Sequence, residues 1–231
     1  MIWFMPQLQV MNLVKTYGGV RAVNDVSFEV EKGELIGLIG PNGSGKTTLL
    51  DLISGFFKPD SGKIFFEGRL INNLEPFKRA AYIGRTFQVS RVFKGMTVLE
   101  NLLAVVKDKQ RANELLELVG LTELSAEYAS NLSGGQQKLL EFARVLMLSP
   151  RLILMDEPFA GVTPSMIDRL VEVINTLNRQ GITFMIVEHN MSLAFRLCRR
   201  CIVLDRGMII ADEPVSQIPY NYRVIEAYLG E

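Results

Sequence analysis

Cysteine, histidine and tryptophan are scarce in this chain of 231 residues, which contains two, one and one of them. The cysteines, Cys198 and Cys201, have the C-x-x-C spacing of a redox or metal pair. A zinc site would need two more ligands, and the only histidine, His189, lies some distance upstream. Because the pair runs from a predicted helix end into an apolar strand, we expect both cysteines to be packing residues. The absence of a disulfide framework is typical of a protein in the reducing cytoplasm.

Long apolar runs are also absent. No stretch reaches the roughly 18 apolar residues that a membrane-spanning helix needs. The N-terminal segment, residues 1–11, is apolar but short, and Gln7 and Gln9 interrupt it. It has neither a basic start nor a small-residue cleavage site, so we do not expect a signal peptide. Any role at a membrane must therefore depend on a partner.

The chain has no excess of charge of either sign. It contains 25 basic and 25 acidic residues, which gives a formal net charge of zero. Such a balance provides no general attraction to nucleic acid or to anionic lipid, and we expect no nucleic-acid partner. Hydrophobic residues make up 48%, which is enough for a substantial core.

The apolar pattern alternates between strands and helices, which predicts an α/β fold with a parallel sheet. The predicted strands cover residues 8–14, 22–30, 34–39, 63–67, 152–155 and 182–187. The predicted helices cover residues 46–54, the stretch from Gly135 to the proline at 150, and residues 164–179. Residues 97–129 have helical periodicity and almost no strand signal, so we interpret them as part of an inserted helical lobe.

Residues 40–47, with the sequence GPNGSGKT, fit the pattern G-x-x-x-x-G-K-[ST] between an apolar strand and a helix. Glycines allow a backbone to wrap closely around phosphate oxygens, and the start of the following helix adds a favourable dipole. Lys46 would place its charge on the outer phosphates, and Thr47 would offer a hydroxyl to Mg²⁺. These residues predict a nucleotide phosphate site.

The apolar strand at 152–155 ends in two carboxylates, Asp156 and Glu157. In a parallel sheet the carboxyl ends of the strands face the ligand crevice. There Asp156 can hold Mg²⁺, and Glu157 can polarise a water molecule for attack on the γ-phosphate. Together with the phosphate site, this pair predicts a P-loop NTPase.

The pentapeptide LSGGQ at residues 132–136 resembles the signature motif of ABC ATPases. Ser133 can cap a helix that starts near Gly134, which would make a second anion site. The stretch KTYG at residues 15–18 resembles the family's adenine-stacking segment, and RTFQ at residues 85–88 resembles its Q-loop. His189, which follows an apolar strand and Glu188, resembles the family's switch histidine.

The resemblance covers about residues 8–231 and implies the fold, the site and the partners. The implied fold is a RecA-like P-loop NTPase core (residues 1–86 and 150–231) with an antiparallel β edge and an inserted α-helical subdomain (about residues 87–149). The implied catalytic residues are Glu157, His189 and Gln88, and the implied Mg²⁺ ligands are Thr47, Gln88 and Asp156. The implied ATP contacts are Tyr17, Gly40, Pro41, Asn42, Gly43, Ser44, Gly45, Lys46, Thr47 and Thr48, with Ser133, Gly134, Gly135 and Gln136 contributed in trans by a second ATPase subunit.

Three stretches resemble the ATP-binding subunit of branched-chain amino-acid importers more closely: residues 84–102, residues 156–164 and the ending at 226–231. This resemblance implies a peripheral protein at the cytoplasmic face of the membrane, bound to transmembrane permease subunits and served indirectly by a solute-binding protein. Import of urea or short amides, a soluble non-transport ABC ATPase and a regulatory module that binds ATP without hydrolysis are the alternatives. One departure is Thr163, which stands where many ABC ATPases have an aspartate at the dimer seam.

The apolar side chains of residues 89–96 allow two interpretations. Val89, Val92, Phe93 and Met96 flank the predicted Q-loop. They would line a groove for the permease's coupling helix, or they would belong to the core of the helical lobe.

Overall fold

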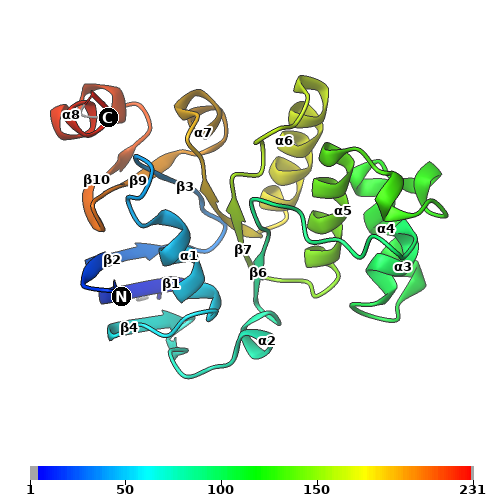
Figure 1. The fold of residues 1–231 in the computed structure, drawn as a ribbon, viewed down its shortest axis with the longest axis horizontal. Coiled ribbons are helices and arrows are strands. Elements are labelled where there is room, and N and C mark those ends of the chain that lie inside the picture. The colour runs from blue at the N-terminus through cyan, green and yellow to red at the C-terminus, as the bar shows by residue number, and fades with distance from the viewer. Residues whose placement is uncertain (1–4, 230–231) are drawn as a thin grey trace.

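Two sheets form the frame of the computed structural model, which describes residues 5–229 (Figure 1). The antiparallel sheet has the order β2-β1-β4-β5, with β1 at Leu8–Tyr17, β2 at Val20–Val30, β4 at Ser61–Phe66 and β5 at Arg69–Leu70. The central sheet has six strands in the order β10-β9-β3-β8-β7-β6. Its strands are β3 (Leu35–Ile39), β6 (Ile83–Arg85), β7 (Leu152–Asp156), β8 (Thr183–Val187), β9 (Arg200–Asp205) and β10 (Met208–Pro214). Only β10 pairs antiparallel to its neighbour.

The central sheet separates two hydrophobic cores, because successive side chains of a strand point to opposite faces. On β7, Ile153 and Met155 pack into the core on the side of the helical lobe, while Leu152 and Leu154 pack into the core below the antiparallel sheet. All five residues of β7 are buried. A strand covered on both faces reads as a continuous apolar run, which is the pattern that the sequence shows.

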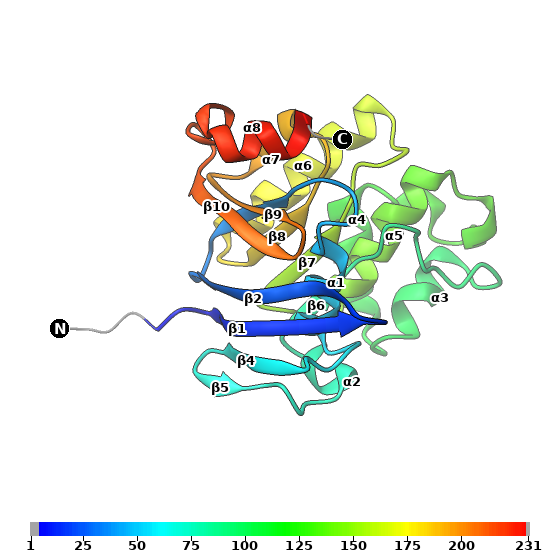
Figure 2. The ribbon, with the colours of Figure 1, turned by 60° about the vertical axis from the view of Figure 1, so that its left-hand side comes forward.

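Eight α-helices of residues 5–229 cover these faces. Helix α1 (Lys46–Ser54) packs into the core with the antiparallel sheet. Helices α3 (Val98–Leu103), α4 (Lys109–Val119), α5 (Gly134–Leu146) and α6 (Pro164–Arg179) pack into the other core. The remaining helices are α2 (Pro76–Arg79), α7 (Met191–Leu197) and α8 (Tyr222–Leu229), and short 3₁₀ turns lie at Thr122–Leu124, Ala129–Asn131 and Ile218–Tyr220. Figure 2 shows the antiparallel sheet in front, with α7 and α8 at the opposite end of the molecule from α2.

Helix caps explain where the helices of the lobe begin. Thr97 and Glu100 form a reciprocal capping box at the start of α3, and the Asp108 side chain accepts a hydrogen bond from the backbone of Arg111 at the start of α4. Gly120 ends α4 in a left-handed conformation with φ 75°, as expected for a C-cap glycine.

The structure confirms the predicted fold class, an α/β core with an antiparallel edge and helices inserted between β6 and β7. Helices α1 and α6 have the predicted bounds. Strand β1 extends to Tyr17, three residues beyond the prediction, and β4 begins at Ser61, two residues before the predicted start, because Ser61 pairs with Val14 of β1. The exact division of the chain into core and lobe stays a prediction.

Cys198 and Cys201 are buried free thiols in the core, as expected for packing residues. Burial raises the pKa of both thiols, that of Cys201 to about 12, which keeps them protonated and unreactive. Part of the apolar N-terminal segment, residues 1–4, and the last two residues of the predicted family ending, 230 and 231, lie outside the described part of the chain. None of the helices in residues 5–229 combines the length and apolar character that a membrane crossing requires.

Candidate functional site

The loop from Gly40 to Thr47 connects β3 to α1 and curls at the carboxyl end of the sheet. Gly45 is the N-cap of α1 with φ 106°, and a Cβ atom added there would lie 2.1 Å from the backbone oxygen of Ala22. Only glycine fits such a position. A loop of this shape turns backbone N–H groups toward an anion, and the N-terminus of α1 follows it directly.

Lys46 lies within this loop and is only 5% exposed. Its Nζ atom donates hydrogen bonds of 2.7 Å to the backbone oxygens of Gly40 and Pro41, and lies 3.4 Å from the Ser44 hydroxyl. The ammonium group is therefore held inside the loop, where its positive charge would attract a bound phosphate. Thr47 is exposed and Thr48 half-buried on the first turn of α1.

Asp156 ends β7 and is 3% exposed. Its Oδ2 lies 3.5 Å from Nη2 of Arg85, whereas its buried Oδ1 has no hydrogen-bond partner among residues 5–229. Burial raises the pKa of Asp156, and Arg85 and the Thr47 side chain oppose that shift. A buried carboxylate oxygen without a partner is unusual. Together with the nearby Thr47 hydroxyl it fits the oxygen ligands that Mg²⁺ prefers.

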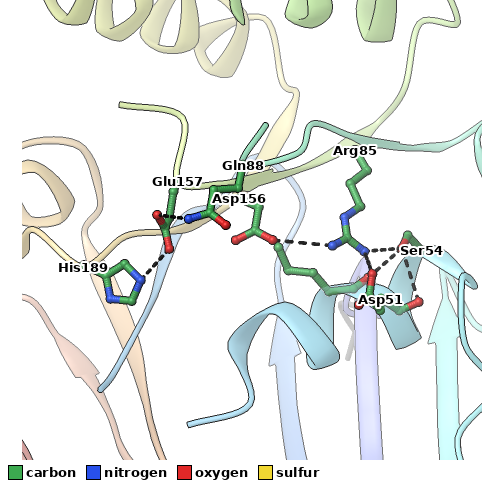
Figure 3. A network of polar contacts seen from close by, with 8 residues as sticks. Asp51, Ser54, Arg85, Gln88, Asp156, Glu157 and His189 are labelled. Carbon is green, nitrogen blue, oxygen red and sulfur yellow. Dashed lines mark hydrogen bonds and ion pairs between the residues drawn. The ribbon is translucent and has the colours of Figure 1, made fainter. Parts of the chain in front are cut away.

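The three predicted catalytic residues come together around Glu157, the residue that follows Asp156 (Figure 3). Oε1 of Glu157 lies 2.5 Å from Nε2 of His189, and Oε2 of Glu157 accepts a hydrogen bond of 2.9 Å from Nε2 of Gln88. Gln88 follows β6, Glu157 follows β7 and His189 follows β8, so three adjacent parallel strands deliver them to one edge. The Glu157 carboxylate is thereby oriented by one neighbour on each side.

Arg85 forms a buried network that the sequence analysis did not identify (Figure 3). Its Nη1 atom lies 2.5 Å from Oδ1 of Asp51 and 3.0 Å from the Ser54 hydroxyl, both on α1. The guanidinium also lies 5.5 Å and 5.1 Å from the ring centroids of Phe56 and Phe87. Arg85 thus ties α1 to the carboxylate of Asp156. The local sequence does not mark this role, because Arg85 is the last residue of β6, a strand of only three residues.

Glu188 is a second residue whose importance the sequence did not reveal, although it precedes His189. It is 5% exposed, and its Oε1 accepts a hydrogen bond of 3.3 Å from the backbone N–H of Phe159. Burial raises the pKa of Glu188 to about 7. The site edge therefore carries a carboxyl group that changes charge near neutral pH.

Tyr17 ends β1 and is 42% exposed. Its ring packs edge-on against Phe57 with a centroid distance of 5.9 Å. Burial raises the pKa of the phenol, the charge of Lys15 opposes this shift, and the charges of Asp51 and Asp60 add to it. Because Asp51 belongs to α1, the ring lies near the helix that follows the phosphate loop.

The signature residues form the N-terminus of α5. Ser133 and Gln136 make a reciprocal capping box, in which each side chain bonds the backbone of the other residue. Ser133 and Gly134 are exposed, whereas Gly135 is buried beneath Met166 of α6. The chain places this helix start and the phosphate loop on different helices, and α5 and α1 pack against opposite faces of the central sheet.

Thr163, at which the sequence departs from the expected family pattern, lies at the N-cap position of α6. Its side chain makes no capping bond to the helix backbone and instead lies 3.3 Å from the Ser165 hydroxyl. Both side chains are neutral, so residues 163–165 add no charge to the start of α6.

A family model described as ABC transporter matches residues 23–160. The chain is 41% identical to the probable branched-chain amino acid transport ATP-binding protein LivG of Archaeoglobus fulgidus, over 96% of this chain and 95% of that protein. It is also 36% identical to the lipopolysaccharide export system ATP-binding protein LptB of Haemophilus influenzae, over 97% of both chains.

Solved structures show the same architecture. A nucleotide-free ATP-binding cassette from an ABC transporter superposes with a TM-score of 0.91 at 36% identity, covering 98% of this chain and 100% of the other. A dimeric cassette in a post-hydrolysis state with ADP and Pi superposes with a TM-score of 0.83 at 28% identity, covering 90% of this chain and 98% of the other.

Proposed function

Because this chain belongs to the ABC transporter family of ATP-hydrolysing subunits, we propose that it powers the import of branched-chain amino acids. The observation that carries the proposal is the convergence of Gln88 and His189 on the Glu157 carboxylate, at the strand edge that also carries Asp156. A regulatory module that only binds nucleotide would not need this arrangement. The solute is proposed from the likeness to the LivG protein of Archaeoglobus fulgidus.

The nucleotide lies, in this proposal, with its triphosphate in the loop of residues 40–47 and its adenine on the Tyr17 ring. When the nucleotide binds, the Lys46 ammonium would leave the backbone oxygens of its own loop and donate to phosphate oxygens instead. Its full positive charge would then strengthen the binding that the backbone N–H groups of the loop provide. Thr47, Gln88 and Asp156 would hold Mg²⁺, which when bound neutralises charge on the β- and γ-phosphates. Asp156 is suited to this role by its unpartnered Oδ1.

Glu157 acts as the base that orients and deprotonates the attacking water. Two hydrogen-bonded neighbours fix its carboxylate, so the group is positioned before the reaction rather than during it. Gln88 lies on the Q-loop side of the carboxylate and His189 on the side of β8. His189 is more than one-third exposed, and would be in reach of the γ-phosphate.

A second ATPase subunit completes each site. The exposed start of α5, formed by Ser133 and Gly134 with Gly135 and Gln136 behind it, offers an anion-binding helix N-terminus, and α5 lies on the opposite face of the central sheet from α1. In a head-to-tail pair this surface would close on the γ-phosphate held by the other subunit. The dimeric cassette found among the solved structures supports this arrangement.

The permease subunits would dock in an apolar groove of about 370 Å³ between the Q-loop, α2 and α5. Phe56, Phe77, Phe87, Val145 and Leu148 are among its lining residues. Docking there would hold the chain at the cytoplasmic face of the membrane as a peripheral subunit, with the solute-binding protein acting through the permease.

The segment 89–96 divides between the two interpretations given for it. Val92 packs against the core of the lobe, whereas Val89 is 78% exposed and Phe93 and Met96 are also exposed. None of these four is among the residues that line the groove, although their neighbour Arg91 is.

The first test is phosphate release by the wild-type chain and by Glu157→Gln. We expect the variant to bind ATP and to dimerise, but to lose turnover by about 10²-fold or more because no base remains. If Glu157→Gln turned over ATP at the wild-type rate, Glu157 would not be the catalytic base. Co-purification from membranes followed by reconstitution in vesicles then identifies the solute: stimulation by leucine supports the proposal, and stimulation only by urea, short amides or lipopolysaccharide replaces it.

A further inference from the structure

The backbone of Glu157 adopts a conformation that a non-glycine residue rarely takes. Its φ angle is 47°, in the left-handed region, although β7 ends only one residue earlier. Such a conformation persists only where the surroundings hold it. Its N–H group donates to the backbone oxygen of Val187 on β8 at 3.0 Å, which secures one side of the turn.

The other side of this turn is held by Lys138. Its Nζ atom donates a hydrogen bond of 2.8 Å to the backbone oxygen of Glu157, which also accepts from the N–H of Ala160 at 3.2 Å. Lys138 belongs to α5, so this single side chain joins the helix of the lobe to the turn that carries the catalytic base.

Lys138 lies close to the N-terminus of α5, so its contact with Glu157 links that turn to the start of the helix. Lys138 follows Gly134, the first residue of α5, by four positions, or about 6 Å along the axis of a helix. The capping box of Ser133 and Gln136 fixes the start of the helix, and Gly135 packs directly beneath Met166. A displacement of the exposed helix start is therefore transmitted through a short rigid segment to Nζ of Lys138.

The surroundings of Lys138 explain why a cation is needed there. The group is half-buried, and burial lowers its pKa while Glu188, Glu141, Glu157 and Asp156 oppose that shift. The ammonium in turn lowers the pKa values of Glu141 and Glu188, which burial raises. Lys138 thus offsets a concentration of carboxylates, yet its 2.8 Å hydrogen bond is directed at the peptide oxygen of Glu157.

We propose that Lys138 is a positioning residue that holds the left-handed turn of Glu157 and couples it to the start of α5. The inference rests on the proposed function, because it assumes that Glu157 is the base and that the start of α5 receives the second subunit's nucleotide. Arrival of that nucleotide at Ser133 and Gly134 would then adjust the base of the opposite site through Lys138. Attack at each site would therefore be fastest when both nucleotides are enclosed.

The test compares Lys138→Met, Lys138→Arg and the control Lys109→Met, which removes an exposed lysine of α4. We expect Lys138→Met to lower kcat by about 10²-fold while ATP affinity and KM change less than about twofold, since the base is misplaced by a small distance and the phosphate loop is untouched. Lys138→Arg keeps a charged donor and should restore most of the turnover. The dependence of rate on ATP concentration should also lose its cooperativity in Lys138→Met, which a purely structural defect would not cause.

A kcat of Lys138→Met within about threefold of wild type would overturn the inference. The role of Glu157 as the base is judged separately, because that role fails if Glu157→Gln turns over ATP at the wild-type rate. Should Lys138→Met not fold, Lys138→Gln, which retains a neutral donor, decides the question by the same comparison. A crystal structure gives a readout without activity: the Glu157 backbone should leave the left-handed region in Lys138→Met and remain there in Lys138→Arg.

Discussion

Three carboxyl groups at one strand edge differ because their surroundings differ. Asp156 is buried beside Arg85, which favours its charged form. Glu157 is held between His189 and Gln88. Glu188 is buried with only backbone donors and the partial influence of Lys138, so its neutral form is favoured up to about pH 7. Similar carboxyl groups at one edge of the sheet can therefore have different roles, because their burial and their neighbouring groups differ.

Glu188→Gln should make the protein more stable at alkaline pH. The pKa of Glu188 is about 7 in the folded chain against 4.5 for an unperturbed carboxyl, so its contribution to stability is fully present below about pH 4.5 and is lost as the pH rises through 7. Glutamine stays neutral at every pH. We expect Glu188→Gln to exceed wild type by on the order of 2–3 kcal/mol at about pH 8.5, and to match it near pH 4.5.

Thermal unfolding across this pH range measures the effect, as a gain of about 5 °C or more in Tm at the alkaline end. The control is Glu123→Gln, which changes an exposed carboxyl of the lobe. A constant difference in Tm between Glu188→Gln and wild type at all pH values would contradict the assignment.

At the scale of elements, the junction between β3 and α1 depends on two glycines in different ways. Gly45 has φ 106° and faces the oxygen of Ala22, whereas Gly43 has φ 74° and has no atom within 4 Å of an added Cβ. We expect Gly43→Ala to cost about 1–2 kcal/mol, the strain of a left-handed alanine. Gly45→Ala should cost clearly more, because the oxygen of Ala22 is a backbone atom that cannot move without disturbing β2.

Urea unfolding without nucleotide gives both values, and it excludes effects on ATP binding. Equal losses of stability in the two variants would show that the close approach to Ala22 contributes nothing.

The elements that sequence could predict are those with long local patterns. Helix α6 and strand β7 were predicted almost to the residue, since each buries a continuous or periodic apolar set. Strand β6 and helix α2 are only three and four residues long, which is too short for periodicity to emerge. Strand β6 matters nevertheless, because it carries Arg85 and delivers Gln88 to the site.

Local sequence patterns could not identify the residues whose roles depend on long-range contacts. The motifs placed Glu157, Gln88 and His189, and the structure brings these three together. Nothing local identifies Arg85, whose partner Asp156 lies 71 positions away in the sequence, or Lys138, which appears as a helix surface lysine. Their roles follow only from the packing of the lobe and α1 against the strand ends.

For the whole molecule, the decisive feature is that the central sheet separates α1 from α5. The phosphate loop precedes α1, and the signature residues begin α5. A chain built in this way carries the phosphate loop and the proposed signature surface on different faces of the sheet. In the head-to-tail pair proposed above, two like chains would supply the missing half of the site to each other, and the pair would contain two equivalent composite sites.

This arrangement predicts complementation between two inactive variants. Lys46→Ala lacks the phosphate cradle, and Ser133→Glu places a negative charge where the γ-phosphate should bind, so each variant alone should be inactive. A mixed pair contains one site in which an intact cradle meets an intact signature, and one site in which both are defective. Random mixing in equal amounts should therefore restore measurable turnover, at most roughly a quarter of the wild-type value, since half of the pairs are mixed and each has one intact site.

Phosphate release by the mixture, compared with each variant alone at the same total concentration, measures this recovery. The matched control mixes Lys46→Ala with Lys46→Ala,Ser133→Glu, because no pair formed there has an intact cradle. If the first mixture stays as inactive as the control while wild type is active, the two halves of the site must act within one chain. Recovery that falls with dilution, as pairs dissociate, would show that the active site forms only where two chains meet.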